Sequence, residues 1–282
     1  MKDSNRVALV TGASSGIGAA TAQAFIERGF TVYCAARRLD RMQDLQALGA
    51  HVLALDLTQA DSIAHLAETI IREQGRLDVL VNNAGYGVYG AVEDIPLDEA
   101  RRQFEVNLFG LADLTRRMLP MMRAARSGRV VNITSIGGKI WSPFGAWYQA
   151  TKFALEGFSD CLRMELRPFG IDVVVVEPGA IKTEWAGIAF GNAAQFSGQG
   201  PYLPISDNIT RAFSRMNRQG GFGSPPRMVA DVIVRAATVR RPRTRYVAPF
   251  SARLFLLLRW LLSDRMFDRI IGTMFGVPKT IG

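Results

Sequence analysis

Apolar residues gather in short runs along this chain, and the stretches between the runs carry apolar residues at helical spacing. Runs of this kind are typical of strands buried on both faces, and their regular alternation with helices indicates a parallel sheet. The pattern therefore predicts an α/β fold, with a doubly wound, Rossmann-type parallel sheet of about seven strands and helices on both faces. We expect strands at 6–10, 30–36, 51–56, 77–81, 130–133 and 171–176, with a last one reached through 240–247.

Length and composition narrow the class of protein. With 282 residues, 48% of them hydrophobic, the chain fits one dinucleotide-binding and catalytic domain spanning 1–282. Only two histidines and two cysteines occur, and none are grouped at metal-ligand spacing, so we expect no metal site, no Cys/His nucleophile pair and no disulfide framework. The polar amino end leaves no room for a secretory signal, and no run approaches the roughly 20 apolar residues of a membrane span. We expect a cytoplasmic protein.

The net charge of +9 lies almost wholly in the last third of the chain. From position 201 onward there are 14 Lys and Arg residues against 4 Asp and Glu, which leaves 20 against 21 in the first 200 positions. No recognisable nucleic-acid-binding module carries this charge, so we interpret it as solvated arginine and expect no nucleic-acid partner.

The first predicted strand leads directly into a glycine-rich turn, Thr11-Gly-Ala-Ser-Ser-Gly-Ile-Gly18, and then into a helix. Glycines let a backbone approach a phosphate closely, and the free N–H groups and dipole of a helix start attract the anion. The turn therefore predicts a dinucleotide-binding site around Gly12, Gly16 and Gly18. A glycine turn without a phosphate ligand is the alternative.

Several polar residues follow predicted strands, at the edge of the sheet where ligands of such folds bind. Arg37 and Arg38 follow the second strand, where an acidic residue would hold an adenosine ribose, and arginine there suits a 2′-phosphate. Surface arginines without a ligand are the alternative. Asp56 and Asn83 follow the third and fourth strands, and we interpret Asp40 as the cap of a helix over 41–48.

The candidate acid–base chemistry lies between 129 and 152. Ser135 follows a strand, and Tyr148 and Lys152 share one face of the next helix because they are four positions apart. An ammonium beside a phenol favours the phenolate and would bring the pKa of the tyrosine toward the working pH. Asn107 falls within a mostly apolar helix predicted over 98–122, where a buried amide serves either as a structural bridge or in a polar relay.

The last hundred residues contain two segments that depart from the alternation of strands and helices. Positions 184–226 are rich in Gly, Phe and Asn, with a helical patch near 209–217. We interpret them as an irregular substrate lid or binding loop, and a disordered segment is the alternative. Positions 252–282 form an apolar, basic C-terminal tail. The tail fits either a helix packed over the substrate site or a partner subunit, which we favour, or an amphipathic helix on a membrane surface.

Six motifs occur in order: Thr11-Gly-Ala-Ser-Ser-Gly-Ile-Gly18, Asn82-Asn-Ala-Gly85, Asn107, Ser135, Tyr148-x-x-x-Lys152 and Pro178-Gly179. Together they resemble the short-chain dehydrogenase/reductase family over roughly 5–250. Within that family the chain looks most like the steroid and retinol dehydrogenase-like members. The resemblance implies that Tyr148 is the acid–base group, that Ser135 binds the substrate oxygen, and that Lys152 lowers the pKa of Tyr148. It also implies that Asn107 positions a water joined to Lys152.

The same resemblance implies an NADP(H)-dependent oxidoreductase that interconverts a hydrophobic ketone or aldehyde and its alcohol, commonly as a homo-dimer or homo-tetramer. A catalytically silent NADP(H) sensor or scaffold is the alternative. We expect Trp141, Phe144, Trp147, Trp185 and Phe190 to form an apolar substrate pocket. The alternative is that they are core aromatics, with Trp147 in particular pointing away from the site. The expected cofactor contacts are Gly12, Ser14, Ser15, Gly16, Ile17, Gly18, Arg37, Arg38, Asp56, Leu57, Asn83, Ala84, Gly85, Tyr148, Lys152, Pro178, Gly179, Ile181 and Thr183.

Overall fold

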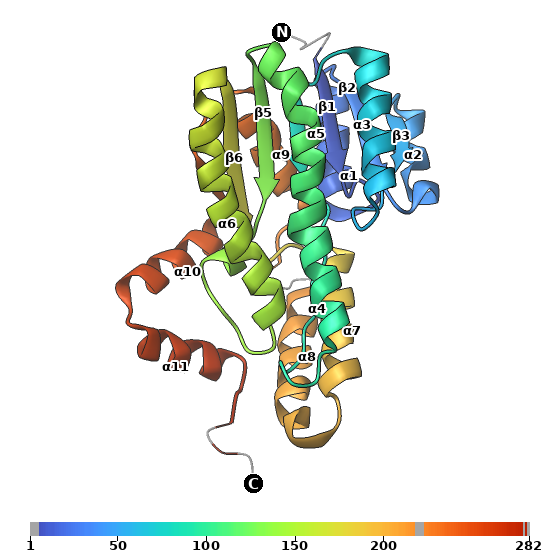
Figure 1. Ribbon diagram of the computed structural model, residues 1–282. Coiled ribbons are helices and arrows are strands. Elements are labelled where there is room, and N and C mark those ends of the chain that lie inside the picture. Colours follow the sequence, from blue (N-terminus) through green and yellow to red (C-terminus); the bar gives the residue numbers. More distant parts are fainter. Residues whose placement is uncertain (1–5, 218–222, 279, 281–282) are drawn as a thin grey trace.

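A computed structural model describes residues 6–217, 223–278 and 280 of the chain. It contains one seven-stranded parallel sheet with the strand order β3-β2-β1-β4-β5-β6-β7 (Figure 1). The predicted Rossmann-type α/β fold is confirmed. The strands are β1 (Val7–Thr11), β2 (Thr31–Ala36), β3 (His51–Ala54), β4 (Val79–Asn82), β5 (Gly128–Ile133), β6 (Ile171–Pro178) and β7 (Arg245–Ala248).

Helices cover both faces of this sheet, because successive strand residues point to opposite sides and both sides are apolar. In β1, Ala8 and Val10 pack against one helical layer, and Val7 and Leu9 pack against the other. The first layer holds α1 (Gly16–Glu27), α2 (Gln43–Ala47) and α9 (Pro226–Thr238), and the second holds α3 (Ala60–Gln74), α5 (Gly110–Ala124) and α6 (Ala146–Leu166).

The predicted helix over 98–122 is interrupted in the structure. It consists of α4 (Leu97–Phe104), a π-helical turn over Glu105–Phe109, and α5. The turn places the fully buried Asn107 where its amide hydrogen-bonds the backbone of Tyr86 and the side chain of Thr151. Such turns insert one extra residue into a helix and are frequent at functional sites.

The segment 184–226 is mostly helical, so the prediction of an irregular loop was wrong. It forms α7 (Glu184–Ser197), a short 3₁₀ turn at Gly200–Tyr202, and α8 (Leu203–Asn217). The helix pair buries small side chains of α7, among them Ala189 and Ala193, against Ile205 and Ile209 of α8. Small residues give a weak apolar signal in sequence, which is why the helix in α7 was not predicted. Residues 218–222 lie outside the described part of the chain.

Two smaller predictions also need correction. Asp40 lies inside a 3₁₀ turn, Leu39–Met42, and makes no capping hydrogen bond to the short helix α2 that follows. The tail forms two helices, α10 (Phe250–Leu261) and α11 (Asp264–Met274), and starts slightly earlier than expected. No helix in the described residues is both long and apolar enough to cross a membrane.

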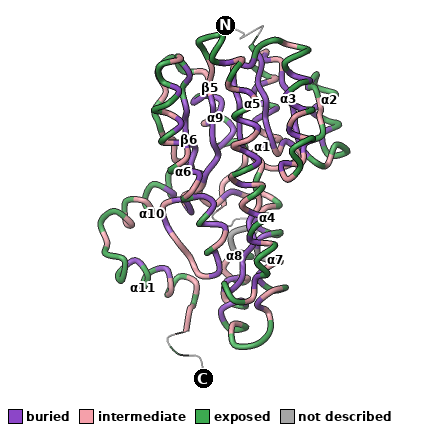
Figure 2. The backbone as a smooth tube through the Cα atoms, viewed as in Figure 1, coloured by how far each residue is buried: buried purple, intermediate pink, exposed green. Residues whose placement is uncertain are grey.

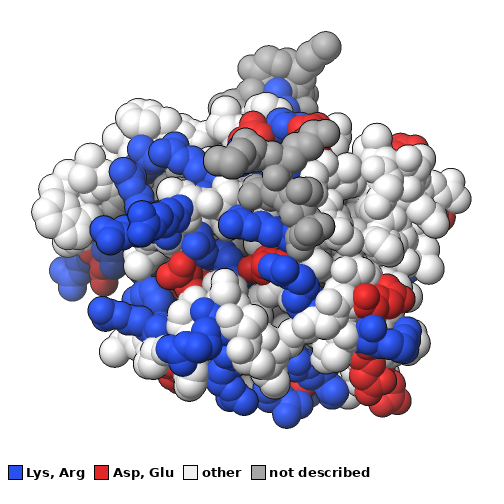
Figure 3. All heavy atoms as spheres, turned by 90° about the horizontal axis from the view of Figure 1, so that it is seen from above, with Lys and Arg blue, Asp and Glu red and all other residues white. Residues whose placement is uncertain are grey.

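The two ends of the sheet differ in what surrounds them. At the carboxyl ends of the strands lie α4, α7, α8 and the tail helices, and α10 and α11 project beside the body with largely exposed outer sides (Figures 1 and 2). The opposite end, where the strands begin, shows more Lys and Arg than Asp and Glu (Figure 3).

Candidate active site

A cavity of about 690 Å³ opens at the carboxyl ends of the strands and brings together most of the predicted site. Among the residues predicted to act in catalysis, it is lined by Ser135, Tyr148 and Lys152. The predicted cofactor contacts that line it are Gly12, Ser14, Ser15, Gly16, Ile17, Arg37, Arg38, Asp56, Leu57, Asn83, Ala84, Gly85, Pro178, Gly179, Ile181 and Thr183. Gly18 and Asn107 do not line it.

The glycine turn is held in a shape that other residues could not adopt. Gly12 and Gly16 have φ angles of +68° and +56°, which L-residues with side chains rarely adopt. Gly18 lies behind the turn, where an added Cβ would come within 2.2 Å of the Gly12 carbonyl oxygen. Gly18 therefore allows α1 to approach the turn and is not itself a cavity residue. The Asn83 amide donates to the Thr11 carbonyl at 2.9 Å and ties the turn to the end of β4.

Arg38 is the arginine placed against the glycine turn. Its guanidinium lies 3.4 Å from the hydroxyl oxygens of both Ser14 and Ser15, and 3.5 Å from a carboxylate oxygen of Glu184 at the start of α7. Arg41, which sequence reasoning missed, contacts both carboxylate oxygens of Glu184, at 2.7 and 2.8 Å. Two guanidinium groups thus lie between the turn and α7, and Glu184 is the carboxylate that contacts both.

Asp56 and Arg37 lie on the neighbouring part of the rim. Burial alone would raise the pKa of Asp56, but hydrogen bonds from the backbone and hydroxyl of Thr58 and the charge of Arg37 outweigh it and lower that pKa. Asp56 is therefore an anion, and its nearest hydrogen-bond donors already come from Thr58.

Ser135 and Tyr148 meet at the inner end of the cavity. Burial raises the pKa of Tyr148 to about 12, and a hydrogen bond with Ser135 partly offsets that rise. The Ser135 Oγ also accepts a hydrogen bond from the Gly137 N–H at 3.0 Å, which fixes the position of the hydroxyl. The tyrosine is therefore a protonated phenol at neutral pH.

Lys152 lies near Tyr148, and the lowering of the Tyr148 pKa by its ammonium that the resemblance implies stays a prediction. Its Nζ donates to the Ile133 carbonyl at 2.9 Å and lies 5.9 Å from the centre of the Tyr148 ring. Burial lowers the pKa of Lys152 to about 8, and the carboxylate of Glu156 opposes the shift. Because desolvation dominates at both groups, each pKa moves toward the neutral form.

Asn107 serves as a bridge. Its Nδ2 donates to the Tyr86 carbonyl at 2.9 Å and to the Thr151 hydroxyl at 3.0 Å, and its Oδ1 accepts from the Tyr86 N–H at 3.1 Å. These bonds attach the loop after β4 to α6, one residue before Lys152. The water relay implied by the family resemblance stays a prediction.

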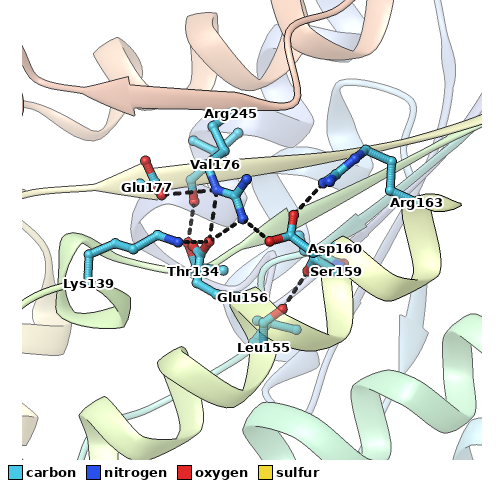
Figure 4. A network of polar contacts seen from close by, with 11 residues as sticks. Thr134, Lys139, Leu155, Glu156, Ser159, Asp160, Arg163, Val176, Glu177 and Arg245 are labelled. Atoms are coloured by element: carbon cyan, nitrogen blue, oxygen red, sulfur yellow. Dashed lines mark hydrogen bonds and ion pairs between the residues drawn. The ribbon is translucent and has the colours of Figure 1, made fainter.

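A partly buried ionic network supports α6 behind the site (Figure 4). Arg245 of β7 lies 3.0 Å from Glu156, 2.6 Å from Asp160 and 3.6 Å from Glu177, and Lys139 lies 3.0 Å from Glu156. Burial and the neighbouring Glu156 raise the pKa of Glu177 to about 7, although Arg245 and Lys139 act in the opposite direction. The network joins β6, β7 and α6, and so fixes the helix that carries Tyr148 and Lys152.

The apolar wall of the cavity differs in part from the prediction. Trp141 and Trp185 line it as expected, with the Trp185 ring 4.9 Å from that of Tyr148. Phe144 and Trp147 are absent from its lining, since Phe144 packs against Tyr202 and the α7 alanines. The side chain of Phe190 lies outside the described residues. The wall residues that were missed include Tyr89, Ile140, Ile188, Phe255, Ile271, Met274 and Phe275.

Four of these missed residues belong to α10, α11 and the turn after them. The buried faces of the tail helices pack Phe267 and Ile271 against Ile140, with Trp141 and Phe255 beside them. The tail helices thus pack over the cavity, as we favoured from the sequence. The apolar residues at 267, 271 and 275 recur at helical spacing, and this was the signal that could have identified the tail residues of the wall.

Comparison with known proteins places this chain in a family. Residues 6–190 match the family model described as short chain dehydrogenase. The protein belongs to the short-chain dehydrogenase/reductase family.

Two relatives and one solved structure illustrate this placement. The chain is 34% identical to a 3-ketodihydrosphingosine reductase of Bacteroides thetaiotaomicron, covering 96% of this chain and 98% of that protein. It is 33% identical to an NADPH-dependent 3-dehydrocapnine reductase of Ornithobacterium rhinotracheale, covering 94% and 95%. A metagenomic short-chain oxidoreductase solved with NADP superposes with a TM-score of 0.69 at 29% identity, covering 88% and 98%.

The residues around the glycine turn suit NADP(H). Gly12 and Gly16 let the turn pack against Ala84 and Thr183, where an added Cβ would come within 2.8 and 3.0 Å of neighbouring atoms. The Ser14 and Ser15 hydroxyls and the Arg38 guanidinium supply donors beside the turn. These groups are the ones that a pyrophosphate and a 2′-phosphate require.

Proposed function

We propose that this protein reduces a ketone on a long apolar chain to the alcohol, at the expense of NADPH. The observation that carries the proposal is the composition of the cavity: Ser135 and Tyr148 form a polar pair at one end, and Trp141, Trp185 and Phe255 belong to an otherwise largely apolar wall. Both relatives described above are named as reductases, one of 3-ketodihydrosphingosine and the other of 3-dehydrocapnine, which supports reduction by this protein too.

The cofactor is held by the glycine turn and the arginines after β2. We assign the pyrophosphate to the residues from Gly12 to Ile17 and the 2′-phosphate to Arg38 with Arg37. NADPH, when bound, supplies the hydride that is transferred to the carbonyl carbon.

Tyr148 donates the proton that the new alkoxide oxygen requires. Because its pKa is about 12, its hydroxyl is protonated at neutral pH and is competent as a general acid in the reductive direction. Ser135 directs its hydroxyl to the same oxygen, and the buried Lys152 ammonium adds positive charge where negative charge develops. Ketone, hydride and proton together give the secondary alcohol.

The test is the dependence of the rate on substrate chain length. Purified protein is mixed with NADPH and a series of 3-keto amino alcohols of increasing alkyl length in detergent micelles, and NADPH oxidation is followed by absorbance. Each methylene that enters the apolar wall is worth about 0.8 kcal/mol, so kcat/KM should rise up to about fourfold per added carbon until the wall is filled.

Tyr148→Phe is the control for the acid–base role and should abolish turnover while NADPH binding persists. Equal kcat/KM for short and long ketones would refute the substrate class. NADPH binding without turnover of any ketone would instead favour the silent sensor or scaffold.

A further inference from the structure

The outer side of the two tail helices is an unusual surface for this molecule. Among the described residues, eight of the twenty exposed large hydrophobic side chains fall between 250 and 274. On α10 they follow one stripe, Phe250, Leu254, Leu257 and Leu261, at the spacing of a single helix face. Trp260 beside the stripe is 80% exposed. A concentration of this kind marks an interaction site.

Positive charge accompanies this apolar surface. Arg253, Arg265 and Arg269 are exposed, and none of them pairs with a carboxylate in the described part of the chain. The two acidic residues of the helices are already engaged: Asp264 pairs with Arg259 at 2.9 Å, and Asp268 accepts from the Trp141 indole at 2.6 Å. Only Asp264 is neutralised by a cation, so Asp268 keeps its charge, and the three unpaired arginines outnumber it and leave this surface net positive.

The same helices form part of the cavity wall with their other side. Ile271 and Phe255 face the cavity from α11 and α10, while Met266 and Ile270 are exposed on the outside of α11. Met274 does both, since it lines the cavity and is 48% exposed. The apolar outer surface is thus continuous with the wall of the cavity (Figure 2 shows the exposed outer side).

We propose that the outer side of α10 and α11 docks on an anionic lipid bilayer. Aromatic and aliphatic side chains flanked by arginines are the combination that binds the headgroup region, where the apolar groups insert and the arginines meet lipid phosphates. A two-fold contact with a second copy would instead bring these arginines against each other, since the same patch faces itself in such an interface.

The docked orientation gives the apolar substrate a path that avoids water. A long-chain ketone dissolved in the bilayer would pass Met274 into the cavity and reach Tyr148 from the tail side. This consequence rests on the proposed function, whereas docking itself does not.

Vesicle binding of the full-length protein tests the docking without substrate or cofactor. The protein is sedimented with vesicles of phosphatidylcholine that contain phosphatidylglycerol, and with vesicles of phosphatidylcholine alone. Binding should be strong only to the anionic vesicles and should weaken with salt. The double variant Leu257→Ser/Trp260→Ser should lower the partition coefficient at least tenfold, and Arg265→Gln/Arg269→Gln should lower it by about fivefold for each arginine removed.

Two matched controls show whether this surface is the one that binds. Met164→Ser removes an exposed apolar side chain of α6, and Arg240→Gln/Arg241→Gln removes two exposed arginines from the end where the strands begin. Both should bind vesicles as the wild type does. In addition, brominated lipid should quench the Trp260 fluorescence, and Trp260→Phe should lose that signal but keep binding.

Three results would overturn the proposal. Vesicle binding that is lost in Arg240→Gln/Arg241→Gln but unchanged in the tail variants would place the contact on the opposite end of the molecule. Absence of vesicle binding, together with a dimer in solution that Leu257→Ser/Trp260→Ser dissociates, would identify a second copy as the occupant. If the protein neither binds vesicles nor forms a dimer through these residues, the docking on a bilayer is refuted. Since ketone reduction is assayed in micelles, failure of docking and failure of the proposed function appear in separate experiments.

Discussion

The carboxylate of Glu184 pairs with the guanidinium of Arg38. We therefore expect this carboxylate to compete with the 2′-phosphate of NADPH for Arg38. The substitution Glu184→Gln keeps the size of the side chain and removes its charge. In the structure the carboxylate contacts Arg38 at 3.5 Å and Arg41 at 2.7 Å, and about half of its surface is exposed. We predict that Glu184→Gln binds NADPH more tightly than the wild type.

The exposure of the three side chains sets the size of the effect. Ion pairs between partners that are this accessible are worth about 0.2–1 kcal/mol, because water and salt screen them. If the phosphate has to displace the carboxylate from Arg38, removing the carboxylate returns at most that energy. The dissociation constant for NADPH should therefore fall by up to about fivefold, where about 1.4 kcal/mol corresponds to tenfold. NADH lacks the 2′-phosphate, and its affinity should not change.

Titration of nicotinamide fluorescence with NADPH and NADH at low and moderate salt measures both constants. Glu27→Gln is a matched control, because Glu27 is similarly exposed and pairs with Arg227 at 2.6 Å away from the cavity. Weaker NADPH binding in Glu184→Gln, or an equal gain for NADH, would refute the competition between this carboxylate and the phosphate.

Three further predictions follow from single residues. Arg38→Ala should weaken NADPH binding by at least about tenfold, since hydrogen bonds to charged groups contribute about 1.5–3 kcal/mol, and should leave NADH binding unchanged. Equal losses for both cofactors in the same fluorescence titration would contradict this prediction. The folded-state pKa of Glu177, about 7, exceeds its ordinary value of 4.5, so its contribution to stability is full below about pH 4.5 and is lost as the pH rises through 7. Urea unfolding should accordingly show Glu177→Gln to be more stable than the wild type at pH 8, by on the order of 1–3 kcal/mol, and no more stable at pH 4.5; a pH-independent gain would show that the charge is not the cause. Gly18→Ala should destabilise the fold by about 1–3 kcal/mol, because its Cβ would lie 2.2 Å from the Gly12 carbonyl oxygen, and an unchanged melting temperature would show that the turn can move away.

The parts of the fold and site that the sequence predicted are those set by local geometry. Gly12 and Gly16 follow a strand and adopt the positive φ angles of a tight glycine turn. A helix places Tyr148 and Lys152 on one face because they are four positions apart, whatever the helix packs against. Since the carboxyl ends of parallel strands share one edge, Ser135 joins these residues without any knowledge of packing.

The parts that were missed depend on contacts between distant segments. The desolvation that raises the pKa of Tyr148 and lowers that of Lys152 arises from the whole surrounding fold, whereas the sequence showed only their mutual spacing. Likewise Phe144 and Trp147 stand close to Tyr148 in the chain, and only tertiary packing turns them away from the cavity.

The order of segments along the chain separates reactivity from selectivity. Every residue assigned to the cofactor or to proton transfer precedes Glu184, whereas Trp185, Ile188 and the tail residues of the apolar wall follow it. The two sets are joined at the end of β6, and the ionic network around Arg245 keeps α6 fixed beside the later segments. Homologous recombination between relatives just after Thr183 would consequently exchange this later part of the wall, while the cofactor and proton-transfer residues and the earlier wall residues Tyr89, Ile140 and Trp141 are inherited intact. A chimaera made at that junction is the direct route to altering selectivity in this scaffold.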